Sequence, residues 1–334
     1  MNSLLFVIRL TVIARRERSE RRGKPYLPKS TKPEYYYIMK KNFCALLLLL
    51  FPLLCFCQND FHFSISPRLS FTYGELTELL YGYDDELVSQ LDWEQKPLFN
   101  LGLEVSSNYK RLIVSALFDY SIPLGTSYMY DSDWDSAGNI YSHSKHPIEH
   151  TINLYSELSI KYDFQINPLL SLFPIISFDY LFSDFKAGIG IKSVYTQYPK
   201  ANKIDYYRHS FFIFSGIGVK LTPVKKLTLA IDFQFAPFSY QYAYDYHYGT
   251  KSPYPFSSYE IQTGYFSKFK TNLSADYKIK NFLTIQLFVN LLLSTPDRGD
   301  FYTDYYSNSL YLSSQKSGAS INSTKFGTAV IFTL

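Results

Sequence analysis

Long segments of this sequence alternate apolar and polar residues with a period of two, which is the pattern of β-strands with two different faces. Over 111–130, apolar side chains occupy the even positions from Leu112 to Tyr130, and most polar side chains occupy odd positions. Similar alternation occurs over 151–162 and 282–293. These segments exceed the roughly five or six residues usual in soluble strands. They favour strands that cross a membrane with an apolar face outward.

Short turns and longer polar stretches alternate along the chain, and ten strands lie between them. The expected strands are 61–81, 88–107, 111–130, 149–165, 169–194, 208–223, 226–245, 257–278, 282–295 and 323–334. The expected long loops are 82–90, 131–149, 195–208, 246–258 and 297–322. An even number of strands, with short turns at one end and long loops at the other, is typical of bacterial outer-membrane barrels. We therefore predict an all-β fold, a ten-stranded antiparallel transmembrane β-barrel with long extracellular loops.

One expected strand, 226–245, reverses its own alternation. From Leu227 to Phe235 the odd positions are apolar, whereas from Phe238 to Tyr244 the even positions are aromatic. We expect a β-bulge at Ala236-Pro237, because an extra residue turns the following side chains to the opposite face and proline cannot donate to the ladder. Without this bulge, the polar residues that end the strand would face lipid.

The first 57 residues follow a different pattern. Residues 1–38 are basic and have no apolar period, so we expect them to be an extension upstream of a true start at Met39. Two lysines after Met39, an apolar run over 43–56 and a small residue before Gln58 predict a secretory signal peptide over 39–57. Lipoprotein processing at Cys57 is the alternative. The mature domain would then be a single barrel over 58–334.

Removing this segment changes the charge of the protein. Residues 1–57 hold 11 of the 33 Lys and Arg and 3 of the 29 Asp and Glu, so the net charge changes from +4 to −4. The basic whole-chain balance therefore gives no reason to expect nucleic-acid binding. All three cysteines also lie before residue 58, which excludes disulfide and thiol chemistry in the mature domain. The 32 tyrosines and 28 phenylalanines are what an aromatic-rich membrane barrel requires.

Two pairs of ionisable residues, each separated by one residue, end expected strands. Asp131 and Asp133 should share one face, as should Asp245 and His247, because residues i and i+2 of a strand point the same way. In a closed barrel both pairs can face one mouth. A neutral histidine beside a carboxylate can take a proton from water, and two close carboxyl groups share a proton. Either pair alone is also consistent with solvated polar side chains at the rim.

The order and spacing of several short motifs resemble the omptin family. They are Val88 to Trp93, Asp131 to Trp134, His146-Pro147 and Asp245-x-His247. The resemblance implies a ten-stranded outer-membrane endopeptidase of the aspartyl type. It implies that Asp245 and His247 activate the attacking water and that Asp131 and Asp133 form the facing acidic pair. It also implies a need for lipopolysaccharide, for which no binding residues can be matched here.

The same resemblance implies which residues recognise the substrate. The segment Gly74-x-x-x-Glu78-x-x-Tyr81 looks like the family site in which a glutamate receives a basic side chain at the cleavage position. A carboxylate facing arginine or lysine is the expected recognition chemistry. A second family acid lies two residues before the catalytic aspartate, and here that position is Ala243. This departure weakens the case for strict cleavage between two basic residues.

Other aromatic and histidine residues have simpler interpretations. Trp93 and Trp134 are expected to pack at the rim rather than stack on substrate. His146 and His150 lack the surrounding pattern of a metal site, so no metal and no cofactor is expected.

The expected partners are peptide or protein substrates and outer-membrane lipid, with the barrel as a monomer. One alternative function is a non-catalytic barrel that serves as an adhesin or a structural protein. A porin is the third class, which ten strands disfavour because they leave little open lumen.

Overall fold

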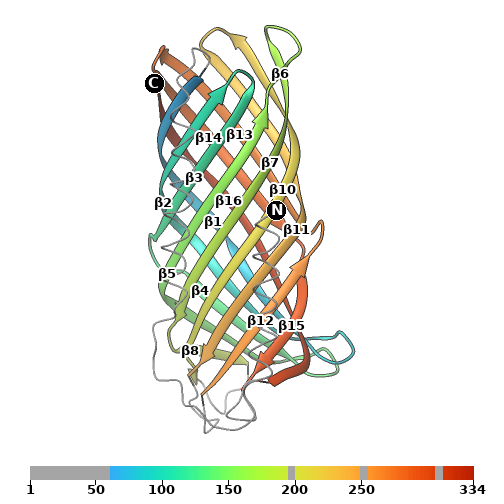
Figure 1. Cartoon of the computed structure of the whole chain (residues 1–334). Coiled ribbons are helices and arrows are strands. Elements are labelled where there is room, and N and C mark those ends of the chain that lie inside the picture. Colours follow the sequence, from blue (N-terminus) through green and yellow to red (C-terminus); the bar gives the residue numbers. More distant parts are fainter. Residues whose placement is uncertain (1–60, 195–199, 249–254, 305–310) are drawn as a thin grey trace, which may run out of the picture. The chain divides into compact units, whose positions relative to one another are not determined.

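The computed structural model describes residues 61–194, 200–248, 255–304 and 311–334 (Figure 1). The expected extension 1–38, the signal peptide 39–57 and the processing site before Gln58 lie outside the described residues. In the part of the chain that is described, no helix is long and apolar enough to cross a membrane. The described residues form one antiparallel sheet of 16 strands.

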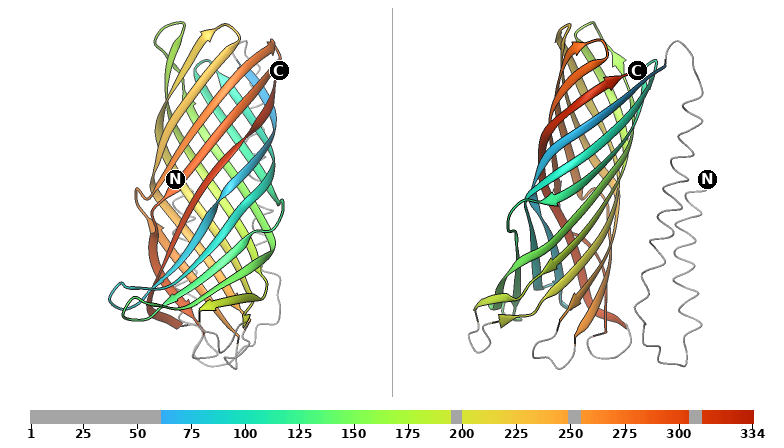
Figure 2. Two further views of the ribbon diagram at one scale, coloured as in Figure 1. Left: turned by 180° about the vertical axis from the view of Figure 1, so that it is seen from behind. Right: turned by 90° about the vertical axis from the view of Figure 1, so that its left-hand side faces the viewer.

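The sheet closes into a barrel. Its strands are β1 (Phe61–Tyr81), β2 (Leu87–Tyr109), β3 (Leu112–Pro123), β4 (Tyr128–Trp134), β5 (Ile140–Tyr162), β6 (Phe164–Gln165), β7 (Leu170–Ala187), β8 (Gly190–Val194), β9 (Lys200–Ala201), β10 (Ile204–Val224), β11 (Leu227–His247), β12 (Phe256–Gly264), β13 (Lys268–Lys280), β14 (Leu283–Ser294), β15 (Asp297–Thr303) and β16 (Tyr311–Thr333). Four barrel strands are interrupted and appear as β3 with β4, β7 with β8, β12 with β13, and β14 with β15. The last strand, β16, pairs with β1 along most of its length and closes the ring, and Figure 2 shows the two side by side in red and blue. The predicted antiparallel ring of 10 strands is confirmed.

All five expected loops contain strand residues, and two of them are wrong over much of their length. The stretch 131–149 contains the end of β4 and the start of β5, joined by a turn at 135–139. The stretch 297–322 contains β15 and the first half of β16. Both lie beyond the membrane, where the outer face of the sheet meets water instead of lipid. Polar residues are then tolerated on both faces, and the alternation that marks a membrane strand is lost.

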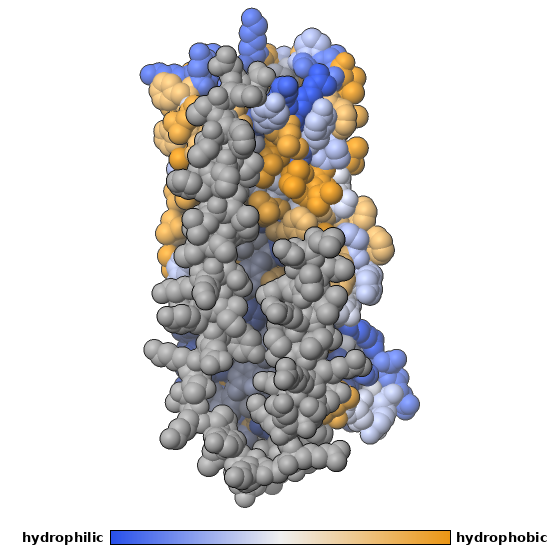
Figure 3. Space-filling model, in the orientation of Figure 1, coloured by the Kyte–Doolittle hydropathy of each residue, from blue (hydrophilic) through white to orange (hydrophobic). Residues whose placement is uncertain are grey.

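The outer surface of the barrel has two zones. The first is a band of exposed apolar side chains that includes Leu69, Phe71, Leu101, Phe118, Ile176, Phe178, Phe211, Phe233, Leu287 and Phe326. The second zone, nearer the long loops, carries outward charges, among them the ion pairs Lys96–Glu94 at 3.0 Å and Lys316–Asp300 at 2.9 Å. Figure 3 shows the hydrophobic band on the visible face, with polar residues toward both ends. Exposed ion pairs are not placed in hydrocarbon, so the second zone lies outside the bilayer.

Inside the apolar band, the barrel is filled by charged and polar side chains. Lys270 lies 2.7 Å from Asp179 and 3.2 Å from Glu157, and Lys325 lies 2.7 Å from Asp119. These contacts join strands that are far apart in the ring, and they pair charges that would be costly to bury alone. The polar face of each strand in this zone is therefore turned inward, as its alternation predicted.

The bulge in β11 is confirmed. Ile213 pairs with Phe238 and Ser215 pairs with Phe235, so Ala236 and Pro237 together lie opposite one residue of β10. Before the bulge the inward residues have even numbers, such as Asp232, and after it they have odd numbers, such as Asp245. The bulge therefore directs the end of β11 into the barrel.

Candidate active site

The last residues of β11 form a hydrogen-bonded pair at the loop end of the barrel. Nε2 of His247 lies 2.7 Å from Oδ2 of Asp245. The other carboxylate oxygen of Asp245 accepts hydrogen bonds from the backbone N–H of Ser258, at 3.1 Å, and from its hydroxyl. The ring of Phe256 stacks on His247 at 4.3 Å between centroids. Both side chains of the pair are thus held from the neighbouring strand β12.

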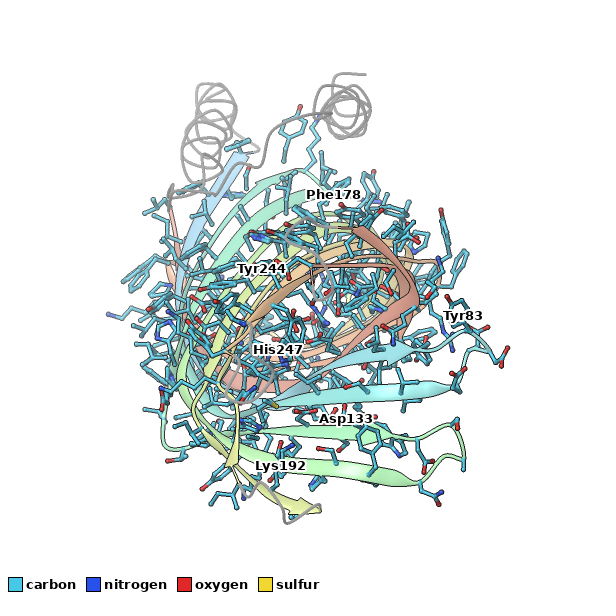
Figure 4. All side chains as sticks on the ribbon, turned by 90° about the horizontal axis from the view of Figure 1, so that it is seen from below. Tyr83, Asp133, Phe178, Lys192, Tyr244 and His247 are labelled. Atoms are coloured by element: carbon cyan, nitrogen blue, oxygen red, sulfur yellow. The ribbon has the colours of Figure 1, made fainter. Side chains whose placement is uncertain are left out.

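Asp131 and Asp133 lie on β4 and face the same interior. Asp131 pairs in register with Leu91 of β2, and Asp133 pairs with Ser89. Ser89 and Ser142, one on each neighbouring strand, are hydrogen-bonded to the carboxyl group of Asp133. Figure 4 looks into the barrel from this end and shows Asp133 and His247 on different strands around the opening. The structure therefore brings together all four side chains expected at the site.

Burial and mutual repulsion determine the charge of the acidic pair. Removal from water, and then the charge of Asp133, raise the pKa of Asp131 to about 7, while His247 and Lys192 oppose the shift. Burial also raises the pKa of Asp133, against hydrogen bonds from Ser89 and Ser142. Near neutral pH the pair therefore holds a proton for part of the time, and can both accept and donate hydrogen bonds.

Asp245 and His247 form a dyad on β11, and their pKa values shift so that the charged form of each is favoured. Burial alone would lower the pKa of His247, but the carboxylate of Asp245, followed by Asp131 and Asp133, outweighs burial and raises it. Burial likewise opposes ionisation of Asp245, yet His247 and the hydrogen bonds from Ser258 hold its pKa below the usual value. Asp245 therefore stays ionised, and the imidazolium of His247 persists to higher pH than that of an isolated histidine.

An apolar cluster forms the floor beneath these groups. Trp93 is fully buried and stacks on both Phe185 and Tyr206, with centroid separations of 5.3 Å in each case. Leu76, Leu91 and Met129 complete the contact. The expectation that Trp93 packs rather than binds substrate is confirmed. This floor keeps water away from the underside of the carboxyl groups, which strengthens their electrostatic interactions.

His146 and His150 have separate structural roles. His146 is fully buried, with Nδ1 2.9 Å from the carbonyl oxygen of Gly188 and Nε2 2.9 Å from the hydroxyl of Ser144. His150 points to the outer surface, where it lies 3.6 Å from Asp184. Within the described residues, no group of three or more His, Cys, Asp or Glu side chains is arranged to hold a metal ion.

Glu78 lies deeper in the same opening, on β1, and only 5% of its surface is exposed. It faces inward, as its parity predicted. Sequence reasoning missed two charged neighbours, Arg208 of β10 and Glu260 of β12, which are also almost fully buried. Glu260 lies two residues from both Ser258 and Gln262 in a strand with alternating polar residues. That alternation could have identified Glu260 as an inward-facing residue. Lys192 of β8, beside the acidic pair, was also missed because it follows an interruption in its strand.

Fold and site together define a transmembrane β-barrel with a cluster of acidic residues and a histidine at its extracellular mouth. The sequence pattern of the Omptin family matches residues 59–333. The chain therefore belongs to the omptin family, and it is an outer-membrane protein whose long loops lie on the extracellular side.

Comparison with solved structures supports the fold. The chain is similar to the outer membrane protease OmpT from Escherichia coli, with a TM-score of 0.71 and 16% identity, over 82% of this chain and 97% of that one. Outer membrane protein OprG from Pseudomonas aeruginosa matches with a TM-score of 0.35 and 7% identity, over 82% of this chain and 95% of that one. The second likeness is too distant to support any argument. No curated protein matched the sequence.

Proposed function

We propose that this omptin-family protease of the outer membrane is an aspartyl-type endopeptidase that uses a water molecule activated by Asp245 and His247. The observation that carries the proposal is the 2.7 Å contact between His247 and Asp245, on the wall of the opening that also holds the acidic pair. A histidine oriented by an ionised carboxylate is a general base, and the carboxylate stabilises the imidazolium that forms. The chemistry needs neither a serine nor a cysteine nucleophile.

Each group has a distinct task in this proposal. Nε2 of His247 donates to Asp245, so Nδ1 is the nitrogen that takes a proton from water. The water oxygen then attacks the carbonyl carbon of the scissile bond. The C–N bond breaks, and the leaving nitrogen receives the proton from the imidazolium. Asp131 and Asp133 hold the water and the carbonyl oxygen, and their shared proton stabilises the negative charge that develops on that oxygen.

Glu78 supports a preference for basic residues at the cleavage site. It is a buried carboxyl group below the dyad, and one of its oxygens, Oε2, has no hydrogen-bond partner. An arginine or lysine side chain that enters from above would supply that partner and a compensating charge. The position of the second family acid is the fully buried Ala243, so strict selection for two basic residues is not part of the proposal.

Three further features belong to the proposal. The mature protein begins near Gln58, after removal of the signal peptide, and residues 1–38 are absent from it. The barrel acts as a monomer on peptides or proteins that reach the cell surface. Lipopolysaccharide is required for full activity.

A peptide library containing Arg and Lys residues, incubated with refolded barrel, tests the function. We expect cleavage beside basic residues, with higher rates when lipopolysaccharide is present, and mass spectrometry of the fragments identifies the bonds cut. A His247→Ala barrel that migrates as folded on a heat-modifiability gel is the negative control. No cleavage by the native barrel with lipopolysaccharide present, or equal cleavage by the His247→Ala barrel, would contradict the proposal.

A further inference from the structure

Three residues on neighbouring strands lie side by side on the inner face of the barrel, below the dyad. Arg208 of β10 pairs with Ala243 of β11, and Ala243 pairs with Glu260 of β12. Residues paired in register across neighbouring strands point to the same face, so all three side chains enter the interior at one level. The side chain of Ala243 is a single methyl group. It is fully buried and packs in the apolar cluster around Trp93.

Glu260 reaches the carboxyl group that is expected to bind substrate. Glu78 and Glu260 are joined by a hydrogen bond between their carboxyl groups. Glu260 also accepts a hydrogen bond from Nε2 of Gln262, at 2.5 Å. Only 2% of Glu260 and 5% of Glu78 is exposed. Two buried carboxyl groups can hydrogen-bond to each other only if one of them carries a proton.

Several polar atoms around this pair have no partner. They are Oε2 of Glu78, Nε of Arg208, the hydroxyl of Tyr206 and Oε1 of Gln262. Unpartnered buried polar atoms are rare in folded proteins. Four of them, at successive register positions around the carboxyl pair, indicate a site that is completed by another molecule with both hydrogen-bond donors and acceptors.

Among the residues that the structure describes, the charged groups on the surrounding strands leave the carboxyl pair without a close cation. On β10, Arg208 donates to the backbone carbonyls of Ser320 and Thr77, at 3.4 and 3.3 Å. On β11, Asp245 is engaged by His247. On β13 and β15, Lys268 and Asp297 neutralise each other at 2.8 Å. On β2, the residue paired with Glu78 is Leu91, which is uncharged. Arg208 thus compensates the negative charge of one carboxyl group from a distance, and a proton neutralises the other carboxyl group.

We propose that Glu260 is the second acid of the specificity pocket, standing across the ladder from Ala243, and that a basic substrate side chain binds by displacing the proton shared with Glu78. The inference rests on the proposed function, in which Glu78 receives that side chain. The exchange conserves charge. The empty pocket holds one carboxylate, one carboxylic acid and Arg208. The occupied pocket holds two carboxylates, Arg208 and the substrate cation, and one proton passes to solvent.

The pair lies outside the bilayer, and its titration falls near neutral pH. Ile261, the residue after Glu260, pairs with Asp300 on the neighbouring strand β15. Asp300 faces outward and forms an exposed ion pair with Lys316. Burial, and then repulsion from Asp245, raise the pKa of Glu260 to about 7 despite the hydrogen bond to Glu78. Burial and the charge of Glu260 also raise the pKa of Glu78. Displacing a proton is therefore easier as pH rises through this range.

The test compares two peptides that differ only in charge, one with arginine at the cleavage position and one with its neutral analogue citrulline. Calorimetry on the His247→Ala barrel measures their binding without turnover. Repeating the titration in buffers of different ionisation enthalpy counts protons. We expect the arginine peptide to bind at least tenfold more tightly and to release up to one proton near pH 7, and the citrulline peptide to release none.

Variants of the pocket complete the test. Glu260→Gln should remove the proton release and lower the arginine preference by about tenfold to a hundredfold, as expected for loss of a charge-assisted contact. Glu78→Gln should have the same effect, which guards against one variant that fails to fold. Glu94→Gln, on the outer surface beside Lys96, is the matched control and should change neither quantity.

Equal binding of the two peptides, or an arginine preference that survives Glu260→Gln with proton release unchanged, would overturn the inference. Because the readout is binding, these outcomes are separate from a failure of the proposed catalytic function, which would appear as absence of cleavage by the native barrel.

Discussion

The two zones of the barrel have opposite distributions of polar and apolar side chains. In the membrane zone, apolar residues such as Phe178 face outward, and ion pairs such as Lys270–Asp179 fill the interior. In the extracellular zone, ion pairs such as Lys316–Asp300 face outward, and an apolar cluster around Trp93 fills part of the interior. The same strands run through both zones. The solvent around each zone, rather than the strand itself, decides which side chains face it.

This difference explains where the chemistry is located. The apolar interior of the extracellular zone removes water from Asp131, which raises its pKa to about 7, whereas for His247 the effect of burial is outweighed by the neighbouring carboxylates, which raise its pKa. In the membrane zone, buried charged side chains form ion pairs with one another, so they are not available to contact a substrate. A substrate also reaches only the zone that lies outside the bilayer. The proposed catalytic groups therefore occur where burial and access are both available.

The largest expected effect is on catalysis. His247→Ala removes the general base, so kcat/KM should fall by about 10²–10⁴-fold on a peptide with arginine at the cleavage site. His150→Ala is the matched control, because this histidine faces outward at the same end of the barrel and lies beside Asp184. It should leave kcat/KM within twofold. A correctly folded His247→Ala barrel with near-native turnover would disprove the assignment of the base.

The next effect separates the two zones by stability. Phe178→Lys places a charge in the apolar band and should lower the free energy of unfolding by about 2–4 kcal/mol. Tyr244→Lys places the same charge on the outer face of the extracellular zone and should cost less than about 1 kcal/mol. Both positions are labelled in Figure 4. Urea unfolding of the two variants in phospholipid vesicles measures the difference, and equal losses would show that the assigned membrane boundary is misplaced.

The smallest effect is the dependence of activity on pH. His247 must be neutral to accept a proton, and its pKa is raised above the ordinary value because Asp245, Asp131 and Asp133 favour the imidazolium. Activity should therefore be fully present above this raised pKa and fall as pH drops through it, by up to tenfold per pH unit. Asp131, with its pKa raised to about 7, titrates in the same range, so the apparent value belongs to the coupled site. A rate for native barrel that stays constant between about pH 8 and pH 5 would contradict this coupling.

The sequence predicts the membrane zone far better than the extracellular zone. Alternation located the ten strands, and the change of parity near Pro237 located the bulge that turns Asp245 inward. The strands over 131–149 were missed because polar residues occupy both of their faces. The partnership of Glu260 with Glu78 could not be predicted, since it depends on the register between β11 and β12 and on how β1 meets β16. Contacts across a closed ring follow from the whole sheet and not from any one strand.

We propose that the dyad on β11 and the acidic pair on β4 act on one water molecule. The direct test is kcat/KM of the Asp131→Ala, His247→Ala and doubly substituted barrels on one arginine peptide, with folding checked by heat-modifiable gel mobility. Groups that serve one step lose their contributions together. We predict that the double variant is little slower than His247→Ala alone. A double variant whose loss equals the product of the two single losses would show that the pairs act independently and would contradict the account.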